Sequence, residues 1–492
     1  MGGRSSISLT TLLVLGLSPA VSDGGIPPAP SGNILYGLVS SDRTLTVATP
    51  GPIYDVIGDL TISSGVTLTV EQGVTLRFAA HSDFLVSGAY PAKVELICQG
   101  HLAAGGSSTR SAFISSSGQF NSWGELYIAA GGTANIQNTD FNGATTIARS
   151  EGTLSLKDCA SQDGNFGEIG VIVSGAANLE DTAILRRYIG IQVETGSLQL
   201  QTSTIEGSNA GVEVLSGIAT IVASTILNNN SGIDNAAIRS AGSIEVVSSE
   251  LDASFGDFGI LATAGTVEIS SVAIRREING IYLHPGVTGA VNNCSLTGAT
   301  QSLGVGLALP HGVVTASPDS VAPEPTLVKG FQYGVRALEP NVAVTHVIAD
   351  SNHTGIYSEF DGTAVNYCTI ARSYNPGVYL GASGTVRNSI SVLNGTVGIL
   401  IDTPPALADY STAWMNPTEN FRVPEGSLGD QVAAYDPAFV LFPIDFHLSP
   451  TSLFLNYSVS GGQIGAYGPG VGGTVDVPRK FWTWGRVKGL YR

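Results

Sequence analysis

The chain has 492 residues, a formal net charge of −17 and only 12% charged residues. This acidic balance argues against nucleic-acid binding, because a phosphate backbone requires clustered lysine and arginine. Glycine makes up 62 of the 492 residues, roughly twice its usual share of about 7%, which favours a fold with many tight turns and little helix. No clustered metal ligands or cofactor motif occur in the sequence, so we expect no cofactor and no metal ion.

Residues 1–22 have the order of a secretory signal peptide. Arg4 precedes an apolar run from Ile7 to Leu17, and the small residues Ala20-Val21-Ser22 form a cleavage site. The apolar run is too short to span a bilayer. We therefore expect an exported protein, secreted or at the cell surface, with no membrane span.

Glycines followed by short alternating strands recur along the chain at intervals of 20 to 25 residues. A second pattern within each unit is a glycine, a β-branched residue, a variable residue and an apolar residue, as in Gly190-Ile191-Gln192-Val193. The period is typical of a solenoid, and the alternation indicates strands with one face inward. The units lack the leucine frame of leucine-rich repeats, so the sequence predicts an all-β fold, a single-stranded right-handed parallel β-helix with terminal caps. The repeating glycines are Gly132, Gly152, Gly175, Gly196, Gly217, Gly242, Gly265 and Gly286.

The same pattern divides the chain into regions. We expect an N-terminal cap region at residues 23–57, a β-helix of about 15 coils at 58–402, and a C-terminal cap at 403–470. A loop at about 309–329 contains Pro310, Pro318, Pro323 and Pro325, which cannot donate ladder hydrogen bonds. Residues 471–492 form a basic, aromatic tail, read either as a sorting or envelope-docking tag or as a basic end packed on the acidic rod.

Small residues recur two positions before an apolar residue in successive units, and three of the four cysteines belong to this column. Because the cysteines lie several coils apart, beyond disulfide reach, we predict that all four are buried free thiols. Asparagines near the motif glycines (Asn209, Asn352, Asn375 and Asn394) predict a ladder of amide hydrogen bonds. The small-residue column is Thr139, Cys159, Thr182, Ser203, Ser224, Ser249, Val272, Cys294 and Cys368.

Two end segments resemble those of a known group. Residues 58–78, beginning Gly58-Asp59-Leu60-Thr61-Ile62, and residues 436–468, beginning Asp436-Pro437-Ala438-Phe439, are similar to the opening coil and closing cap of right-handed β-helix proteins of the pectate-lyase-like superfold, especially large secreted bacterial surface proteins. The resemblance implies the fold. Asn456 departs from it, since the cap commonly has aspartate there.

The same superfold contains polysaccharide-cleaving enzymes, so we looked for their sites. Asn138-Thr139-Asp140 and His311-Gly312 match parts of a polygalacturonase-like site, but the chain has no Asp-Asp pair, and Arg486-Val487-Lys488 lies in the tail. Asp252 and Asp257 are the nearest approach to an acidic cluster and are interpreted as solvated turn residues. We therefore assign no catalytic residue from the sequence.

The variable residue of the motif is expected to point outward. Tyr282, Tyr357, Tyr379, Arg239, Arg336 and Glu213 lie in this column and are the candidate ligand-binding residues, since tyrosine presents an apolar body with a polar tip. The alternative is an ordinary exposed strand, because tyrosine has high β-propensity. Two arginine pairs, Arg186-Arg187 and Arg275-Arg276, are interpreted mainly as solvated turn residues. The full column is read as Gln192, Glu213, Arg239, Leu261, Tyr282, Gly306, Arg336, Tyr357, Tyr379 and Leu400.

Three functions remain open. The first is a noncatalytic secreted or cell-surface β-helix that binds carbohydrate or another cell-envelope partner. The second is a polysaccharide lyase or glycoside hydrolase whose site is assembled from non-adjacent coils, which a carboxylate cluster with arginine on the outward column would favour. The third is a structural spacer. The sequence leaves the oligomeric state open.

Overall fold

The structure is a computed structural model that describes residues 29, 32–47, 52–162, 168–227, 236–252, 257–299, 303–315 and 324–468. The predicted signal peptide and the basic tail lie outside the described residues, as do Pro318 and Pro323 of the expected loop. Within the described part, no helix is long and apolar enough to cross a membrane.

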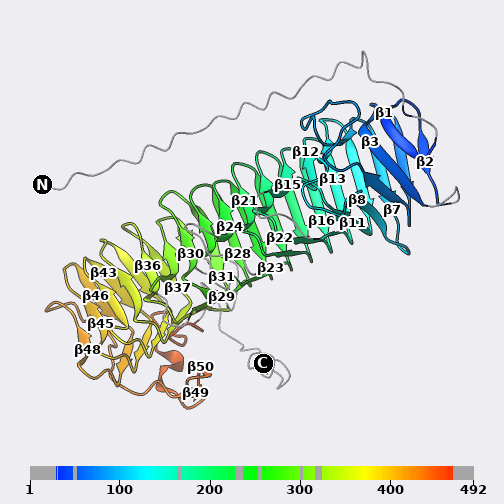
Figure 1. The fold of residues 1–492 in the computed structure, drawn as a ribbon. Coiled ribbons are helices and arrows are strands. Elements are labelled where there is room, and N and C mark those ends of the chain that lie inside the picture. The colour runs from blue at the N-terminus through cyan, green and yellow to red at the C-terminus, as the bar shows by residue number, and fades with distance from the viewer. Residues whose placement is uncertain are drawn as a thin grey trace, which may run out of the picture.

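The chain winds as a right-handed parallel β-helix of about 16 turns, which confirms the predicted fold class. A typical coil contains three strands, and each strand pairs in parallel with the equivalent strand of the next coil. The three resulting ladders form the long sides of a rod, here called faces A, B and C (Figure 1). Parallel pairing extends beyond 58–402 at both ends, from Ile34 to Arg422.

Face A carries the Gly-β-branched motif. The long strand β3 links face A to face C, because its first half pairs with β5 of face C and its second half pairs with β6 of face A. Its strands are β1 (Ile34–Val39), β3 (Ile53–Ile62), β6 (Leu96–Cys98), β9 (Leu126–Ile128), β12 (Ala148–Ser150), β15 (Ile169–Val173), β18 (Ile189–Val193), β21 (Ala210–Val214), β24 (Ala236–Ser240), β27 (Phe258–Ala262), β30 (Asn279–Leu283), β33 (Val305–Leu309), β36 (Tyr333–Ala337), β39 (Thr354–Ser358), β42 (Val378–Leu380), β45 (Val397–Ile401) and β48 (Glu419–Arg422).

Face B follows face A in each coil and consists of a 12-stranded and a 4-stranded sheet. Its strands are β2 (Arg43–Leu45), β4 (Thr67–Glu71), β7 (His101–Gly105), β10 (Thr133–Gln137), β13 (Thr153–Lys157), β16 (Ala176–Glu180), β19 (Ser197–Gln201), β22 (Ile218–Val222), β25 (Ser243–Val247), β28 (Thr266–Ser270), β31 (Thr288–Asn292), β34 (Val313–Val314), β37 (Ala343–Thr345), β40 (Thr363–Asn366), β43 (Gly384–Arg387) and β46 (Ala406–Asp409).

Face C completes each coil. Its strands are β5 (Thr75–Phe78), β8 (Ser111–Ser115), β11 (Thr139–Asn142), β14 (Ala160–Gln162), β17 (Ala183–Leu185), β20 (Thr204–Glu206), β23 (Thr225–Leu227), β26 (Glu250–Asp252), β29 (Ala273–Glu277), β32 (Ser295–Gly298), β35 (Thr326–Lys329), β38 (Val347–Asp350), β41 (Thr369–Ala371), β44 (Ile390–Val392) and β47 (Thr412–Trp414).

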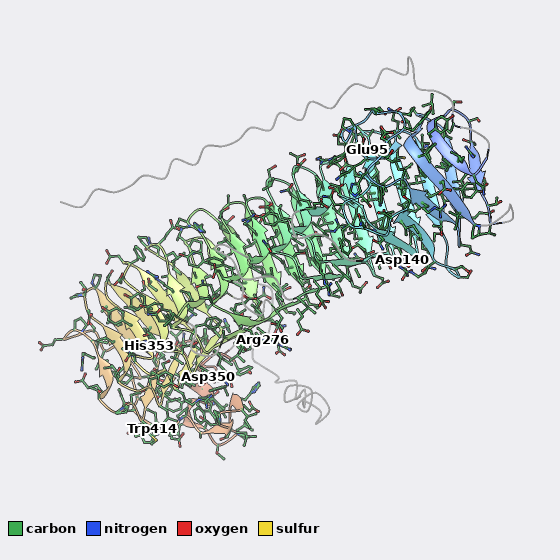
Figure 2. All side chains as sticks on the ribbon, viewed as in Figure 1. Glu95, Asp140, Arg276, Asp350, His353 and Trp414 are labelled. Atoms are coloured by element: carbon green, nitrogen blue, oxygen red, sulfur yellow. The ribbon has the colours of Figure 1, made fainter. Side chains whose placement is uncertain are left out.

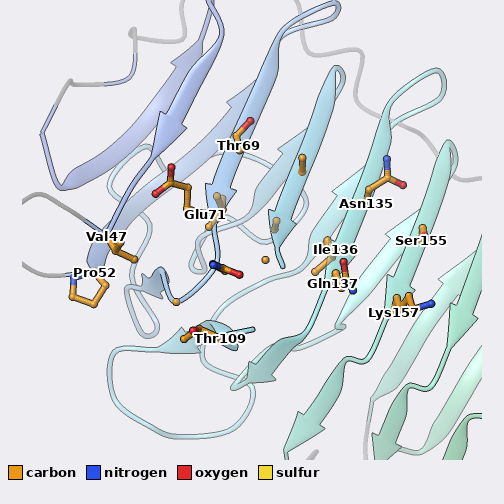
Figure 3. A pocket seen from close by; sticks show the side chains of 16 residues that line it. Val47, Pro52, Thr69, Glu71, Thr109, Asn135, Ile136, Gln137, Ser155 and Lys157 are labelled. Atoms are coloured by element: carbon orange, nitrogen blue, oxygen red, sulfur yellow. The ribbon is translucent and has the colours of Figure 1, made fainter. Parts of the chain in front are cut away.

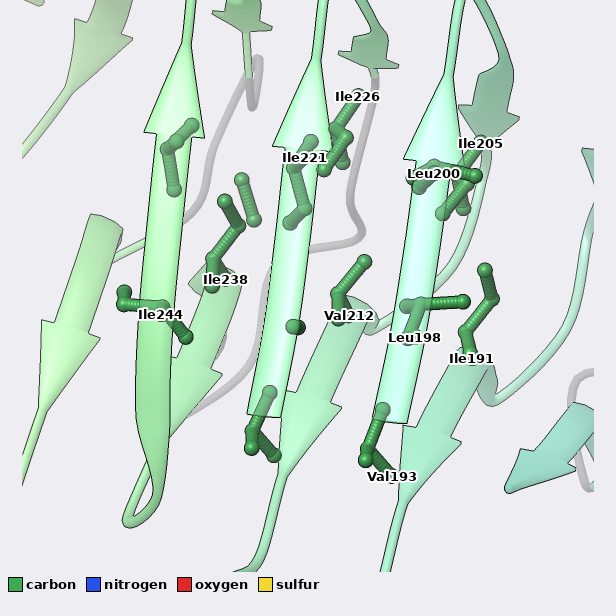
Figure 4. Packing of buried hydrophobic residues seen from close by; sticks show 14 of the residues in the cluster. Ile191, Val193, Leu198, Leu200, Ile205, Val212, Ile221, Ile226, Ile238 and Ile244 are labelled. Atoms are coloured by element: carbon green, nitrogen blue, oxygen red, sulfur yellow. The ribbon is translucent and has the colours of Figure 1, made fainter. Parts of the chain in front are cut away.

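The core is one continuous apolar column inside the rod. Alternate residues of every strand point inward, so Ile191 of face A, Leu200 of face B and Ile205 of face C meet in one coil and stack on their equivalents in the next (Figure 4). All three are fully buried. Burying branched side chains in register is the main stabilising contribution of such a fold, at about 1.5–3 kcal/mol per residue.

Two columns of glycine explain the sequence repeat. A Cβ on Gly196, at the corner between faces A and B, would lie 1.9 Å from the carbonyl oxygen of Gly175 in the preceding coil. A Cβ on Gly211, at the start of a face A strand, would lie 2.3 Å from Ile226 Cγ2 in the core. At both corners the coils approach too closely for any side chain.

The corner between faces B and C is built from a left-handed residue followed by a small one. Asn293 has a φ of 50°, and Cys294 then turns its thiol toward the carbonyl oxygen of Asn292 at 3.2 Å. In neighbouring coils serine and threonine make the same contact, and the backbone N–H of one coil donates to the hydroxyl of the next, as from Ser203 to Ser224 at 3.2 Å. The cysteines are free and buried, as predicted.

An asparagine ladder exists, but not every predicted member belongs to it. Asn352 is fully buried and bonds to backbone groups of Phe331 and Val328, and Asn394 is bonded to Asn416 one coil further on. Asn375 lies outside this ladder, because its amide contacts the ring of His353 at the surface.

After the last coil the chain returns along the outside of face C. The hairpin of β49 (Phe439–Leu441) and β50 (Asp445–Leu448), followed by the 3₁₀ helix η1 (Leu453–Asn456), packs on outward apolar residues such as Ile348 and Ile390. Figure 1 shows this segment beside the C-terminal coils. It therefore covers the outside of face C at the C-terminal coils.

Candidate functional site

The predicted outward column is present on face A with one error. The register aligns Gln192, Glu213, Arg239, Leu261 and Tyr282 on consecutive strands. The next position is Ala308 and not Gly306, because Leu307 pairs with the inward Ile281. Gly306 belongs to the corner column, where a Cβ would lie 2.1 Å from Val328 Cγ1. The column then continues through Arg336, Tyr357, Tyr379 and Leu400.

The first part of the column is a closed polar network. Gln192 donates to Glu213 Oε2 at 2.7 Å, and Arg239 forms an ion pair with Glu213 Oε1. The side chain of Glu213 is only 8% exposed, whereas that of Arg239 is 37% exposed. Both oxygens of Glu213 are therefore satisfied by neighbouring coils, and Arg239 offers more surface to a ligand than Glu213 does.

The second part is a group that we call the tyrosine stack, formed by Tyr333, Tyr357 and Tyr379 with Arg336. Ring centroids are 4.6 Å apart between Tyr333 and Tyr357, and 5.2 Å apart between Tyr357 and Tyr379. The guanidinium of Arg336 lies 5.6 Å from the first ring and 6.0 Å from the second. Tyr333 was missed in the sequence because it precedes the motif glycine of its strand.

Stacking turns the edges of these rings outward. Because Tyr357 has neighbouring rings on both sides, its hydroxyl and ring edge, and not its face, are available to a ligand. The hydroxyl donates to Glu359 Oε1 at 2.5 Å. Partial burial and this hydrogen bond raise the pKa of Tyr357 above its usual range. Burial and a hydrogen bond to Asp402 likewise raise the pKa of Tyr379.

Tyr282 lies apart from the tyrosine stack, because Ala308 occupies the strand between it and Arg336. Its ring packs edge-on against Phe258 at 5.7 Å and against His284 at 5.4 Å. Face A therefore presents two aromatic groups along one line, separated by an alanine.

A buried carboxylate group that sequence analysis missed lies near the N-terminal end of the rod, where Figure 2 labels Glu95. Asp59, Glu95 and Glu125 each stand directly before a leucine of β3, β6 or β9, and these three leucines pair with one another in register. The three acidic residues therefore stack on one another in successive coils. We call them the acid ladder. Each is at most 2% exposed. Burial raises the pKa of Asp59 to about 6 and, with repulsion from Asp59 and Glu125, raises that of Glu95 to about 8.

The acid ladder binds the backbone of the loop that covers it. Glu95 Oε2 accepts the N–H of Ala89 at 2.7 Å, and Asp59 accepts the hydroxyl of Ser87 at 2.6 Å and the N–H of Glu95 at 2.7 Å. Asp83, on the loop itself, accepts the N–H groups of Leu85 and Ser87. These bonds hold residues 83–90 against the first coils.

Basic residues adjoin the acid ladder. Arg149, on the outward column of face A, bonds to Glu125 at 3.0 Å, and burial lowers the pKa of Lys93. The interpretation of Arg187 as a solvated turn residue is wrong, because it is 1% exposed and donates to two backbone carbonyl oxygens. The interpretation of Asp252 as a solvated turn residue is also wrong, because its side chain is buried and pairs with the guanidinium of Arg276, which reaches solvent.

A groove of about 900 Å³ lies on face B over β4, β7, β10 and β13 (Figure 3). Its lining combines amide, hydroxyl and small side chains, including Thr69, Ala103, Asn135, Gln137 and Ser155. None of the sequence-predicted residues lines it. Among the described residues, no group of three or more acidic, histidine or cysteine side chains could hold a metal ion.

The chain was compared with protein families, curated proteins and solved structures. No protein-family model matches it, and no curated protein matches it. Among solved structures it is similar to the crystal structure of pectate lyase Pel9A, with 14% sequence identity, 83% of this chain and 87% of that chain covered, and a TM-score of 0.27.

Proposed function

We propose that the protein is a noncatalytic, secreted or cell-surface β-helix that binds an extended polysaccharide along face A. The observation that supports this proposal is the tyrosine stack, in which Tyr333, Tyr357 and Tyr379 lie on successive coils with Arg336 against two of the rings. Successive coils repeat at about 4.8 Å, so a linear polymer would meet the same chemistry at regular steps.

The bonds to such a polymer come from ring edges and their partners. Tyr357 with Glu359 and Tyr379 with Asp402 form hydroxyl–carboxylate pairs whose oxygens can accept from sugar hydroxyls, since each tyrosine proton is already donated to its carboxylate. Arg336 supplies fixed donors. Tyr282 with His284 forms a second contact further along the same line.

A lyase or hydrolase is the second candidate, and one observation favours it. The acid ladder adjoins Arg149, which lies on the outward column and bonds to Glu125. In the described structure Asp59 accepts the hydroxyl of Ser87 and Glu95 accepts the backbone N–H of Ala89, so a substrate would reach these carboxylates only after that loop moved. A reducing-end and unsaturated-product assay on each bound glycan tests this candidate directly.

The binding proposal is tested by replacing Tyr282, Tyr357 and Tyr379 together with alanine and measuring retention on immobilised polysaccharides. We expect about a tenfold loss of affinity, since ring edges and hydroxyl partners disappear together. The matched control replaces three exposed tyrosines off the outward column, which are Tyr188, Tyr374 and Tyr435. Unchanged retention of the first variant, or equal loss in the control, would contradict the proposal.

A further inference from the structure

The face B groove is hollow because small residues sit in the middle of two outward columns. One column reads Thr69, Ala103, Asn135 and the other Glu71, Gly105, Gln137 on β4, β7 and β10. A Cβ on Gly105 would lie 1.8 Å from the carbonyl oxygen of Gln137. The backbone itself therefore forbids a side chain there, and the hollow is a fixed part of the fold.

The wall of the groove is held in place. Thr109 stands over the turn that contains Gly73. The segment around it is tied by a hydrogen bond of 2.9 Å from Ser108 to Gln72, and by an ion pair of 2.6 Å between Arg110 and Asp140. Two anchors on different coils make this wall a defined surface.

The lining carries hydrogen-bonding groups that the protein does not use. The side chains of Thr69, Asn135, Gln137 and Ser155 make no hydrogen bond among the described residues. Lys157, at the far end, is engaged by Glu180 at 2.8 Å, so the groove offers mainly neutral amides and hydroxyls.

We infer that this groove is a second binding site, separate from face A, for a neutral oligosaccharide laid along the rod axis. Amides and hydroxyls on successive coils match the repeated hydroxyl or acetamido groups of such a chain, while Ala103, Val47 and Pro52 offer apolar surface to its ring faces. A charged sugar acid is disfavoured, because the protein has a net charge of −17 and the carboxylate of Glu71 lines the groove.

The test uses linear hexasaccharides of glucose, xylose and N-acetylglucosamine, with a galacturonic acid hexamer as the anionic counterpart, measured by calorimetry. Two variants act on the groove, one replacing Asn135 and Gln137 with alanine and one Ala103→Trp. The matched control replaces Gln199 and Gln201, which occupy the same two columns on β19 outside the groove. Equal unfolding midpoints establish that all variants fold.

We expect at least one neutral hexamer to bind and both groove variants to weaken it about tenfold or more, with no change in the Gln199 and Gln201 control. Failure of every neutral hexamer to bind, binding of the anionic hexamer alone, or equal loss in the control would overturn the inference. Loss in the tyrosine variant of face A but not in the groove variants would support face A binding and reject this site, so the two proposals fail separately.

Discussion

The carbonyl oxygen of Gly175 lies 1.9 Å from the place where a Cβ would stand on Gly196. Gly196→Ala should therefore push two coils apart and destabilise the protein by about 1–3 kcal/mol, the usual cost of overpacking. Denaturant unfolding measures the change. Gly32→Ala is the control, since a Cβ there meets no atom within 4 Å, and equal unfolding midpoints for the two variants would contradict the clash.

The acid ladder predicts a loss of local stability as the pH rises from about 4 to about 8. The pKa values of Asp59 and Glu95 are raised to about 6 and about 8 from their usual values of 3.8 and 4.5, so the folded state binds protons that the unfolded state has released. The contribution of these two protonated groups to the free energy of unfolding is fully present below pH about 4 and is lost as the pH rises to about 8. Hydrogen exchange of the amides of residues 85–90, corrected for intrinsic rate, should increase across this window.

Glu95→Gln should remove most of that pH dependence, because the amide cannot ionise beside Asp59 and Glu125. The exposed carboxylate of Glu245, on face B, provides the control, and Glu245→Gln should leave the exchange profile unchanged. Hydrogen-exchange rates that do not change with pH in the wild-type protein would contradict the prediction, and would show that the ladder stays protonated or hydrated throughout.

The four thiols should be inert in the folded protein. Burial raises the pKa of Cys98 and Cys159 to about 11, and of Cys294 and Cys368 to about 12, and the thiolate is the reactive form. A thiol reagent at neutral pH should label none of them before denaturation and all four afterwards without reductant. Fewer than three labelled thiols in the denatured chain would indicate a disulfide.

Arg372 joins the returning C-terminal segment to the rod. It forms a bidentate ion pair with Asp350 at 2.8 and 2.5 Å and lies 5.7 Å from the ring of Phe442. Since Asp350 is only 4% exposed, Arg372→Ala should cost about 1–3 kcal/mol and speed proteolysis of the hairpin. Arg422→Ala, which breaks an exposed pair with Glu419, should cost less than about 1 kcal/mol.

Much of the fold could be predicted because it follows from local pattern. Period-two alternation fixes which residues face inward, and the glycine spacing reflects corners where Gly175 and Gly196 have no room for a side chain. The column of small residues that includes Cys294 was found for the same reason, since each coil repeats the same turn. The prediction failed where the pattern was ambiguous. Gly304-Val305 was taken for the start of the motif in place of Gly306-Leu307, so Gly306 was assigned to the outward column in place of Ala308.

The sites could be predicted only in part. Tyr357 and Tyr379 were identified because they occupy equivalent positions in successive motifs. The acid ladder was missed because Asp59 and Glu95 stand 36 residues apart in the sequence. They form a buried group only because the loop of residues 83–90 folds over them. The groove was missed because its defining features are the small side chain of Ala103 and the lack of one at Gly105, and neither belongs to a recognisable motif.

In the described part of the rod, strand pairing joins each coil only to the coils before and after it, and this has a mechanical consequence. Backbone hydrogen bonds run along the rod, so tension between its ends would pass through every coil in series and release the coils one at a time. A coil occupies about 4.8 Å of the folded rod, yet the 21 residues from Gly175 to Gly196 would extend to about 70 Å when released. A pull on the C-terminal end would first peel off the segment held by Arg372, and the rod would then lengthen in steps while the remaining coils kept their shape.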